Sequence, residues 1–317
     1  MASMLHPARG SIRVVPTIDA NGLEIGYDVE GAGPPLILLQ GATSTASRDF
    51  RAQLPSLRRA FRVFAPDARG HGRTAWDVGA RGFEAGWLVD DVLAFADALG
   101  IGTFHLVGFS LGAMTALGVA VRVPDRLRTL VVVGISTERE PRATIARRVM
   151  DPARIERDDP AWAAALAARH DPGQGPGAWR RLGPAIAADV AVQPLLTPRE
   201  IRSIDAPTLV AVGDRDPFTP VDHALALSRT VLDGRLLVLP GAGHEAFVER
   251  ASIATEALGT FYRSTEAVAI RRAGSDTTAD SNPYLGYADP TRRDPHSDPG
   301  SRGHTGGDPQ SPAMEGT

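Results

Sequence analysis

The chain has 317 residues, a formal net charge of -3 and no cysteine, and 43% of its residues are hydrophobic. This length is enough to bury one large domain, or one domain with an insertion. The charge gives no electrostatic case for nucleic acid or an anionic membrane surface as a partner. The absence of cysteine excludes disulfides, thiolate metal sites and a cysteine nucleophile.

The N-terminal stretch has no apolar core of signal-peptide length, and no window of the sequence reaches the apolar length of a membrane span. Residues 1–11 are predicted to be a flexible leader. We expect a cytoplasmic protein without a membrane partner.

The first predicted elements form an edge hairpin followed by a buried strand. Strands are expected at Ile12–Val15 and Leu23–Val29, and Asn21-Gly22 supplies the turn between them. Leu36–Leu39 is a continuous apolar run, which is typical of a parallel strand that is buried on both faces. This strand ends in the loop that begins Gln40-Gly41-Ala42-Thr43.

Helices and strands then alternate along the chain. A helix is predicted at Arg51–Ala60, a strand at Arg62–Pro66, a helix at Glu84–Leu99, a strand at Phe104–Phe109 and a helix at Leu111–Arg122. This alternation predicts an α/β fold whose mostly parallel central sheet carries helices on both faces.

After the next predicted strand, Thr129–Val133, the pattern changes. Residues 136–203 contain no strand run but short helical pieces rich in Ala and Arg, with start signals at Asp159-Pro160 and at Thr197. We interpret this segment as an inserted helical lid. Strands at Thr208–Val212 and Leu236–Leu239 resume the sheet, with helices from Thr219 and over Glu245–Tyr262.

These elements predict a core made of residues 12–135 and 204–263, interrupted by the lid. The remaining segment, residues 264–317, has few apolar residues and is rich in Asp, Pro, Gly, Ser, Arg and Thr. Such a composition buries too little surface to offset the entropy of ordering, so a disordered tail is expected.

A serine stands between the predicted strand and helix, in Gly108-Phe109-Ser110-Leu111-Gly112. A hydroxyl nucleophile on such a tight turn needs small neighbours, because the backbone is strained and strand and helix pass closely. Ser110 would also need a base, and a carboxylate to orient that base.

His244 is the candidate base. It follows a predicted strand on the glycine-rich loop Gly241-Ala242-Gly243, where sites gather in open α/β sheets. The other histidines fall in presumed tails, the lid, a strand, a turn and a helix (His6, His296, His304, His170, His105, His71, His223). The loop after the preceding strand offers two carboxylates, Asp214 and Asp216.

The order Ser, Asp, His together with this turn resembles the α/β-hydrolase superfamily, in particular its esterase-like serine members with a helical lid. Residues 108–112 match the nucleophile elbow, 67–72 a D-x-R-G-x-G loop, 213–217 the acid loop and 241–244 the histidine loop. The resemblance implies an α/β-hydrolase fold and Asp216 as the acid. It also implies an oxyanion hole made of the backbone N–H groups of Ala42 and Leu111.

Two features depart from family patterns. Gln40-Gly41 stands where members commonly have His-Gly, which puts loop shape and substrate choice in doubt. The serine nucleophile and the lack of Pro after Gly41 disfavour epoxide hydrolase and dehalogenase chemistry. In the family, Asp67 and His71 mainly brace a loop.

The resemblance implies hydrolysis of an ester, lactone or related acyl bond of a small molecule through an acyl-enzyme, with water as second substrate and with no cofactor or metal. Alternatives on the same residues are a cofactor-free lyase, a C–C hydrolase, and a peroxidase or acyltransferase. A non-catalytic ligand-binding member is a further alternative. The lid carries no motif that indicates the substrate, although Trp162, Trp179, Arg139, Arg142, Arg147 and Arg148 are candidates for lining a pocket or for packing and surface roles.

Overall fold

The computed structural model of the chain describes residues 16–76 and 83–275. Two compact units divide the chain, residues 1–270 and residues 271–317, and the site discussed below lies in the first. Among the described helices, none is long and apolar enough to cross a membrane.

In the described part of the chain, eight strands form one sheet in the order β1-β2-β4-β3-β5-β6-β7-β8. Strands β3 to β8 pair in parallel, and β2 pairs antiparallel with both β1 and β4. The predicted, mostly parallel sheet is therefore confirmed. The strands are β1 Thr17–Ala20, β2 Leu23–Glu30, β3 Pro35–Leu39, β4 Arg62–Pro66, β5 Phe104–Phe109, β6 Leu127–Val133, β7 Thr208–Gly213 and β8 Gly234–Leu239.

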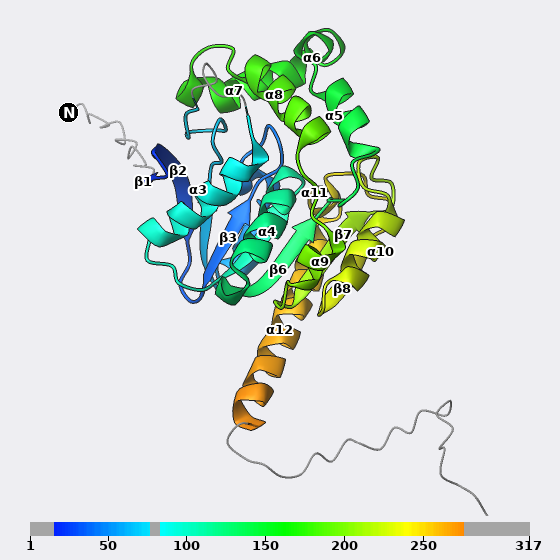
Figure 1. Cartoon of the computed structure of the whole chain (residues 1–317). Helices are drawn as coiled ribbons and strands as arrows, with labels where there is room; N and C mark the ends of the chain where they lie inside the picture. Colours follow the sequence, from blue (N-terminus) through cyan, green and yellow to red (C-terminus); the bar gives the residue numbers. More distant parts are fainter. Residues whose placement is uncertain (1–15, 77–82, 276–317) are drawn as a thin grey trace, which may run out of the picture. The chain divides into compact units, whose positions relative to one another are not determined.

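Helices cover both faces of the sheet (Figure 1). Because side chains of a strand alternate between faces, Ile37 of β3 packs in the core beneath α3, α4 and α10, while Leu36 and Leu38 pack with α12 on the other face. The helices of this core are α1 Ala46–Asp49, α2 Leu54–Leu57, α3 Ala85–Ala98, α4 Leu111–Arg122, α10 Val221–Thr230, α11 Ala246–Glu249 and α12 Ala251–Ser275, with a 3₁₀ turn at Pro124–Arg126.

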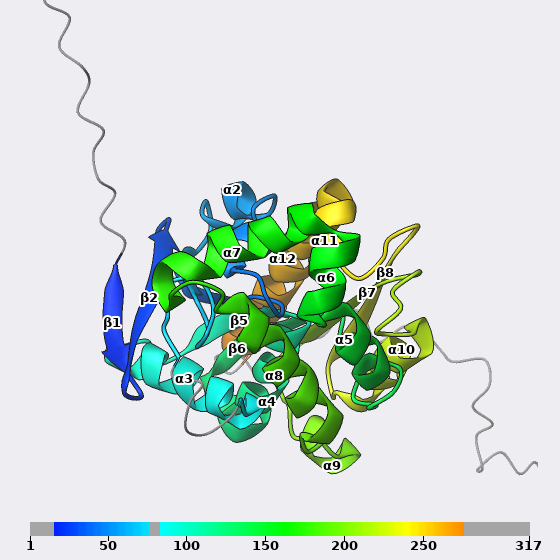
Figure 2. The same ribbon diagram turned by 90° about the horizontal axis from the view of Figure 1, so that it is seen from above.

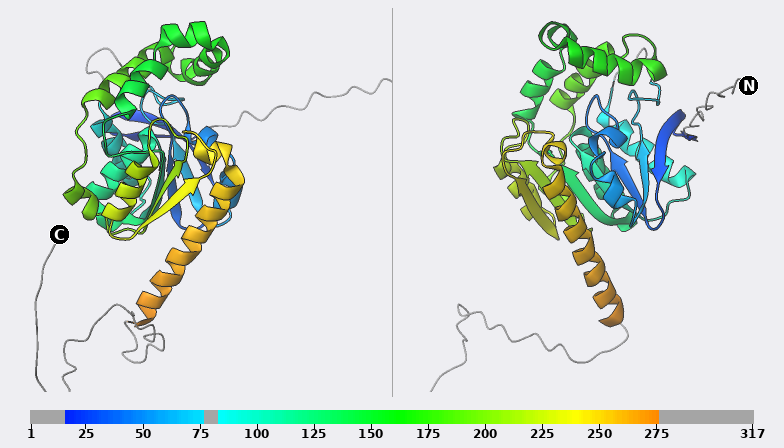
Figure 3. Two further views of the ribbon diagram at one scale, coloured as in Figure 1. Left: turned by 90° about the vertical axis from the view of Figure 1, so that its right-hand side faces the viewer. Right: turned by 180° about the vertical axis from the view of Figure 1, so that it is seen from behind.

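Between β6 and β7 the chain forms five helices joined by loops and no strand, as predicted for this segment, and all of its residues are described. The helices are α5 Arg142–Val149, α6 Pro152–Asp158, α7 Pro160–Gln174, α8 Trp179–Val192 and α9 Pro198–Arg202. Helices α5 to α8 lie beyond the end of the sheet at which β6 ends (Figures 1 and 3), and α7 crosses that end when seen from above (Figure 2). The predicted caps are present: Asp159 accepts from Trp162 N, and Thr197 with Glu200 forms a capping box.

The structure differs from the predicted elements in three places. The single helix expected at Arg51–Ala60 is reduced to α2, because Pro55 has no N–H to donate to a carbonyl one turn earlier and so must lie in the first turn. The closing helix is divided at Arg250 into α11 and α12. Helix α12 also continues to Ser275, past the predicted core boundary at residue 263, so the expectation of disorder is wrong for residues 264–275.

The physical reason for that extension is composition, since residues 264–275 contain three Ala, two Arg, one Glu and one Ile, which are good or acceptable helix formers. The predicted strand Ile12–Val15, the predicted leader and residues 276–317 of the predicted tail lie outside the described residues. Strand β1 instead precedes the Asn21-Gly22 turn directly.

Candidate active site

Ser110 occupies a strained turn between β5 and α4. Its φ of 51° lies in the left-handed region, which few residues with a side chain adopt. A Cβ on Gly108 would lie 2.2 Å from the carbonyl oxygen of Gly112, and a Cβ on Gly112 would lie 2.3 Å from that of Leu39. Only glycine fits at these two positions, which explains the small residues flanking the serine. The backbone N–H of Ser110 donates to Val133 O of the neighbouring strand β6 (2.8 Å).

The loops after β7 and β8 bring Asp216 and His244 to this serine. Ser110 Oγ and His244 Nε2 are 2.9 Å apart, and His244 Nδ1 and Asp216 Oδ2 are also 2.9 Å apart. The Asp216 side chain has no exposed surface, and its other oxygen accepts from the backbone N–H groups of Phe218 (2.8 Å) and Thr219 (3.2 Å). An ionised carboxylate only accepts, so this geometry directs Nδ1–H toward Asp216 and leaves Nε2 free to accept the Ser110 proton.

The second candidate acid, Asp214, has a different role. Its Oδ1 accepts from the backbone N–H of Ala242 (3.2 Å), so it braces the loop that carries His244. The imidazole of His244 is itself flanked by Phe109 and Phe218, with ring centroids 5.0 Å and 4.3 Å away. These aromatic contacts and the Asp216 hydrogen bond hold the ring orientation.

Two backbone donors near Ser110 have no partner. In the described part of the chain, no protein group accepts a hydrogen bond from the N–H of Ala42 or of Leu111. Leu111 is the first residue of α4, where the helix dipole favours negative charge, and Ala42 lines the same cavity as Ser110. Free donors at such a place suit a developing oxyanion.

The loop that carries Ala42 is anchored by Asp49 of α1. Gly41 N donates to Asp49 Oδ2 (2.9 Å), and Ser44 Oγ donates to Asp49 Oδ1 (2.5 Å). Burial raises the pKa of Asp49 to about 6, because desolvation of the carboxylate outweighs these two hydrogen bonds. A single buried carboxyl group thus ties down both ends of the turn around Ala42.

Gln40, which replaces the common histidine, supports the same loop from the other side. In the amide orientation that satisfies both partners, Gln40 donates to Pro66 O (3.1 Å) and accepts from Ala68 N (2.9 Å). Its side chain is buried and links the end of β3 to the end of β4. The departure from His-Gly therefore changes this link and leaves the backbone donors in place.

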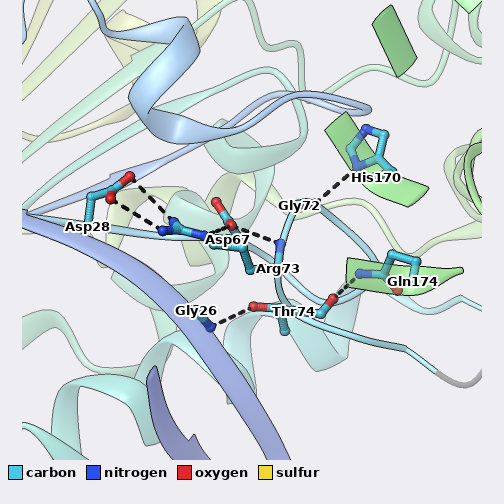
Figure 4. A network of polar contacts seen from close by, with 8 residues as sticks. All are labelled: Gly26, Asp28, Asp67, Gly72, Arg73, Thr74, His170 and Gln174. Atoms are coloured by element: carbon cyan, nitrogen blue, oxygen red, sulfur yellow. Dashed lines mark hydrogen bonds and ion pairs between the residues drawn. The ribbon is translucent and has the colours of Figure 1, made fainter. Parts of the chain in front are cut away.

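A network of polar contacts holds the loop after β4 (Figure 4). Asp67 accepts from the backbone N–H and Nε of Arg73 (3.0 Å and 2.5 Å), and Arg73 also reaches Asp28. Desolvation raises the pKa of Asp67, and burial lowers the pKa of the fully enclosed His71 to about 3. Neither side chain contacts Ser110 or His244 in the described residues, in keeping with a bracing role.

A cavity of about 330 Å³ opens over Ser110. Its lining combines the core loops with four residues of the helical segment, Val149, Met150, Trp162 and Arg169. Trp162 was among the sequence candidates, whereas Trp179 is buried in a small cluster and Arg139 donates to backbone carbonyls. Sequence reasoning missed Arg169 and Asp49. The full lining is Ala42, Thr43, Ser44, Arg48, Asp49, Phe109, Ser110, Val149, Met150, Trp162, Arg169, Phe218, His244 and Glu245.

No group of three or more His, Asp or Glu side chains in the described residues is arranged to hold a metal ion. The groups assembled around Ser110 include its hydroxyl, an imidazole with its carboxylate, and the backbone N–H groups of Ala42 and Leu111. Such an arrangement can activate a serine and stabilise an anionic tetrahedral intermediate.

The sequence and fold were compared with those of known proteins. Residues 36–257 match the model of the Alpha/beta hydrolase family. The chain is 30% identical over 249 residues to 2-hydroxy-6-oxo-2,4-heptadienoate hydrolase of Pseudomonas putida, covering 73% of this chain and 90% of that protein. It is 29% identical over 278 residues to 2-hydroxymuconate semialdehyde hydrolase of a Pseudomonas species, covering 80% and 95%.

Among solved structures, a thermophilic esterase from Thermogutta terrifontis superposes with a TM-score of 0.63 at 25% identity, covering 79% of this chain and 97% of the esterase. The family model spans strands β3 to β8, the helical segment and the loops that carry Ser110, Asp216 and His244. The chain belongs to the Alpha/beta hydrolase family.

Proposed function

We propose that this chain is a serine hydrolase that cleaves an ester, lactone or related acyl bond of a small molecule. The observation that carries the proposal is the chain of hydrogen bonds from Ser110 through His244 to the buried Asp216, placed beside the unpartnered N–H groups of Ala42 and Leu111. A nucleophile, its base, the group that orients the base and the donors for an oxyanion are thus present together.

In the proposed reaction, His244 Nε2 takes the proton of Ser110 as Oγ attacks the carbonyl carbon. The oxygen of the tetrahedral intermediate accepts from Ala42 N and Leu111 N, while Asp216 stabilises the imidazolium. His244 then protonates the leaving group, and an acyl-serine remains. Water, deprotonated by the same histidine, attacks this ester, and His244 returns that proton to Ser110 Oγ as the acid is released. Every step uses protein groups and water alone.

We assign the helical segment 136–203 the role of a lid. The support is that Val149, Met150, Trp162 and Arg169 of this segment line the cavity over Ser110. The lid residues would then select substrates by their shape, and the core residues would catalyse the reaction. Apolar and aromatic side chains make up much of that lining, which suits an organic substrate.

Hydrolysis of a C–C bond is the second candidate. The similarity to two proteins named as hydrolases of 2-hydroxy-6-oxo-2,4-heptadienoate and of 2-hydroxymuconate semialdehyde supports it. Cleavage of a C–C bond beside a carbonyl leaves a carbanion equivalent that must be protonated, so it demands more of the acid at the site than ester cleavage does. The same serine, histidine and oxyanion donors could serve both reactions.

The test is a panel of p-nitrophenyl esters, lactones and a 2-hydroxy-6-oxo-2,4-dienoate, assayed on wild type and Ser110→Ala with products identified by mass spectrometry. We expect ester or lactone turnover by wild type that Ser110→Ala lacks. A kcat/KM for the dienoate far above that for every ester would select the second candidate. Turnover retained in Ser110→Ala would overturn both.

A further inference from the structure

The residue after Ala42 is held in an unfavourable conformation. Thr43 has a φ of 60°, and a β-branched residue in the left-handed region is strained by about 1–3 kcal/mol. Such a conformation persists only when the surroundings impose it. The contacts that hold Thr43 therefore also determine where the adjacent N–H of Ala42 points.

One of these contacts comes from the core. Thr43 N donates to His71 Nε2 (3.1 Å), and His71 Nδ1 lies 3.0 Å from Arg69 O. A carbonyl oxygen only accepts, so Nδ1 carries the proton and Nε2 is the acceptor. His71 thus fixes the N–H side of Thr43 from the loop after β4.

Thr43 Oγ1 donates to Ala42 O (2.7 Å), and further contacts come from helix α7 of the helical segment. His170 Nδ1 accepts from Gly72 N (3.0 Å), so its proton lies on Nε2, which donates to Thr43 O (3.0 Å). Arg169, the preceding residue, also donates to Thr43 O. Figure 4 shows His170 reaching from the helix to Gly72 across the gap between the segments.

Both ring nitrogens of His170 are occupied and its side chain is fully buried, so it cannot act on a substrate. Burial lowers the pKa of His170 to about 4 and that of His71 to about 3, and both rings stay neutral near neutral pH. Neutral rings are required, because a protonated ring has no acceptor nitrogen for Gly72 N or Thr43 N. The charged groups facing this pair are Arg169 and Asp171 of α7.

We propose that His170 is a positioning residue of the oxyanion hole: from helix α7 it fixes the Thr43 carbonyl and thereby aims the N–H of Ala42 at the reacting carbonyl oxygen. This rests on the proposed function. Asp49 holds Gly41 N and Ser44 Oγ, His71 holds Thr43 N, and His170 completes the set, so that Ala42 N is the free donor at the centre of a fixed turn. The N–H of Ala42 is then correctly oriented only when helix α7 is packed against the core and His170 contacts Thr43 O.

Two substitutions test separately the two hydrogen bonds of His170, the one from Gly72 N and the one to Thr43 O. In His170→Asn the amide oxygen can replace Nδ1 as acceptor for Gly72 N, but the shorter side chain no longer donates to Thr43 O, which keeps only the bond from Arg169. In His170→Gln the longer amide can place a donor near the former Nε2. The matched control is Gln174→Ala, which removes another anchor of α7, the bonds of Gln174 with Thr74 O and Trp76 N, without touching Thr43.

The readout is kcat and KM for p-nitrophenyl butyrate, with the melting temperature of each full-length variant. A displaced oxyanion donor costs about 10- to 100-fold in rate, so we expect His170→Asn to lose kcat in that range with KM within about twofold. His170→Gln should recover most of the rate. Gln174→Ala should lower the melting temperature, since each of its two neutral hydrogen bonds contributes about 1 kcal/mol, while kcat stays within about twofold because Thr43 keeps its contacts.

Wild-type kcat in His170→Asn would overturn the inference, and so would equal losses of kcat in His170→Asn and Gln174→Ala. If His170→Asn does not fold, His170→Ser, whose small side chain leaves room for water, is measured with the same expectation. Ser110→Ala is assayed in parallel. Activity retained there would refute the proposed function, whereas its loss with an unchanged His170→Asn would refute only the role of His170.

Discussion

Within residues 16–76 and 83–275, two serines contact a histidine at nearly the same distance, yet their surroundings differ. Ser110 Oγ is 2.9 Å from His244 Nε2, and Ser136 Oγ, just after β6, is 2.8 Å from His223 Nδ1. Ser110 sits on a strained turn over a cavity, and Asp216 holds its histidine. Ser136 is fully buried and already accepts from Glu138 N (2.9 Å).

In the described part of the chain, no carboxylate contacts His223, and neither Ser136 nor His223 lines the cavity. A third pair, His105 with Thr129 Oγ1 (2.8 Å), joins neighbouring strands β5 and β6 inside the core. The comparison teaches that a hydroxyl–imidazole hydrogen bond does not by itself make a nucleophile. Access, an orienting carboxylate and free oxyanion donors distinguish the candidate site from the two structural pairs.

The largest expected effect is on kcat, and it should distinguish Ser110 from Ser136. Ser110→Ala removes the attacking oxygen, so kcat should fall on the order of 10⁴-fold or more. Ser136→Ala removes two hydrogen bonds, one with His223 and one from Glu138 N, and should cost about 1–3 kcal/mol of unfolding free energy with kcat nearly unchanged. Steady-state kinetics and denaturant titration of both variants measure this. A large kcat loss in Ser136→Ala with normal stability would erase the distinction.

The next largest effect concerns Asp216, the carboxylate that contacts the histidine of the Ser110–His244 pair. Asp216→Asn keeps the shape but no longer stabilises the Nδ1–H tautomer or the imidazolium, so kcat should fall about 10⁴-fold. Asp214→Asn is the control, since an amide oxygen can still accept from Ala242 N. A hydrogen bond of this kind contributes about 1 kcal/mol, so its kcat should stay within about fivefold. Equal losses in the two variants would contradict the assignment of the acid.

The smallest effect belongs to the core pair and should appear only in stability. Burial lowers the pKa of His105 to about 4, so below pH 6.5 the unfolded chain binds a proton that the folded chain does not. Stability is therefore complete above pH 6.5 and falls with acidification, and His105→Gln lacks this contribution. Between pH 7 and pH 5, wild type should lose about 2 kcal/mol more than His105→Gln in urea titrations. Parallel losses would show that His105 is not buried as a neutral ring.

The candidate triad could be predicted from sequence because each of its parts has a local signal. Gly108 and Gly112 mark the turn, and the apolar run of β5 and the helical period of α4 gave the predicted bounds Phe104–Phe109 and Leu111–Arg122. His244 and Asp216 follow strands whose carboxyl ends meet at one edge. The structure brings these three side chains together, with Asp214 directed elsewhere.

What the sequence could not predict are contacts between distant segments. His170 and Thr43 are separated by 127 positions, and no spacing rule connects a helix of the insertion to a loop of the core. For the same reason, the sequence did not indicate that Arg169 of α7 lines the cavity over Ser110. The predicted helix at Arg51–Ala60 was wrong in its length, because Pro55 limits the helix although the apolar spacing favours a longer one. The end of α12 was missed because the composition of the tail was dominated by Pro and Gly residues farther along the chain.

The central claim is that Ser110, and not Ser136, is the nucleophile. The most direct test is to react the full-length protein with a fluorophosphonate and to map the modified residue by peptide mass spectrometry. Activated serines react with this reagent, and buried hydroxyl groups without a carboxylate-oriented base and oxyanion donors do not. The account predicts a single adduct on Ser110 whose formation is greatly slowed in Asp216→Asn. An adduct on Ser136, or no adduct on the folded protein, would contradict it.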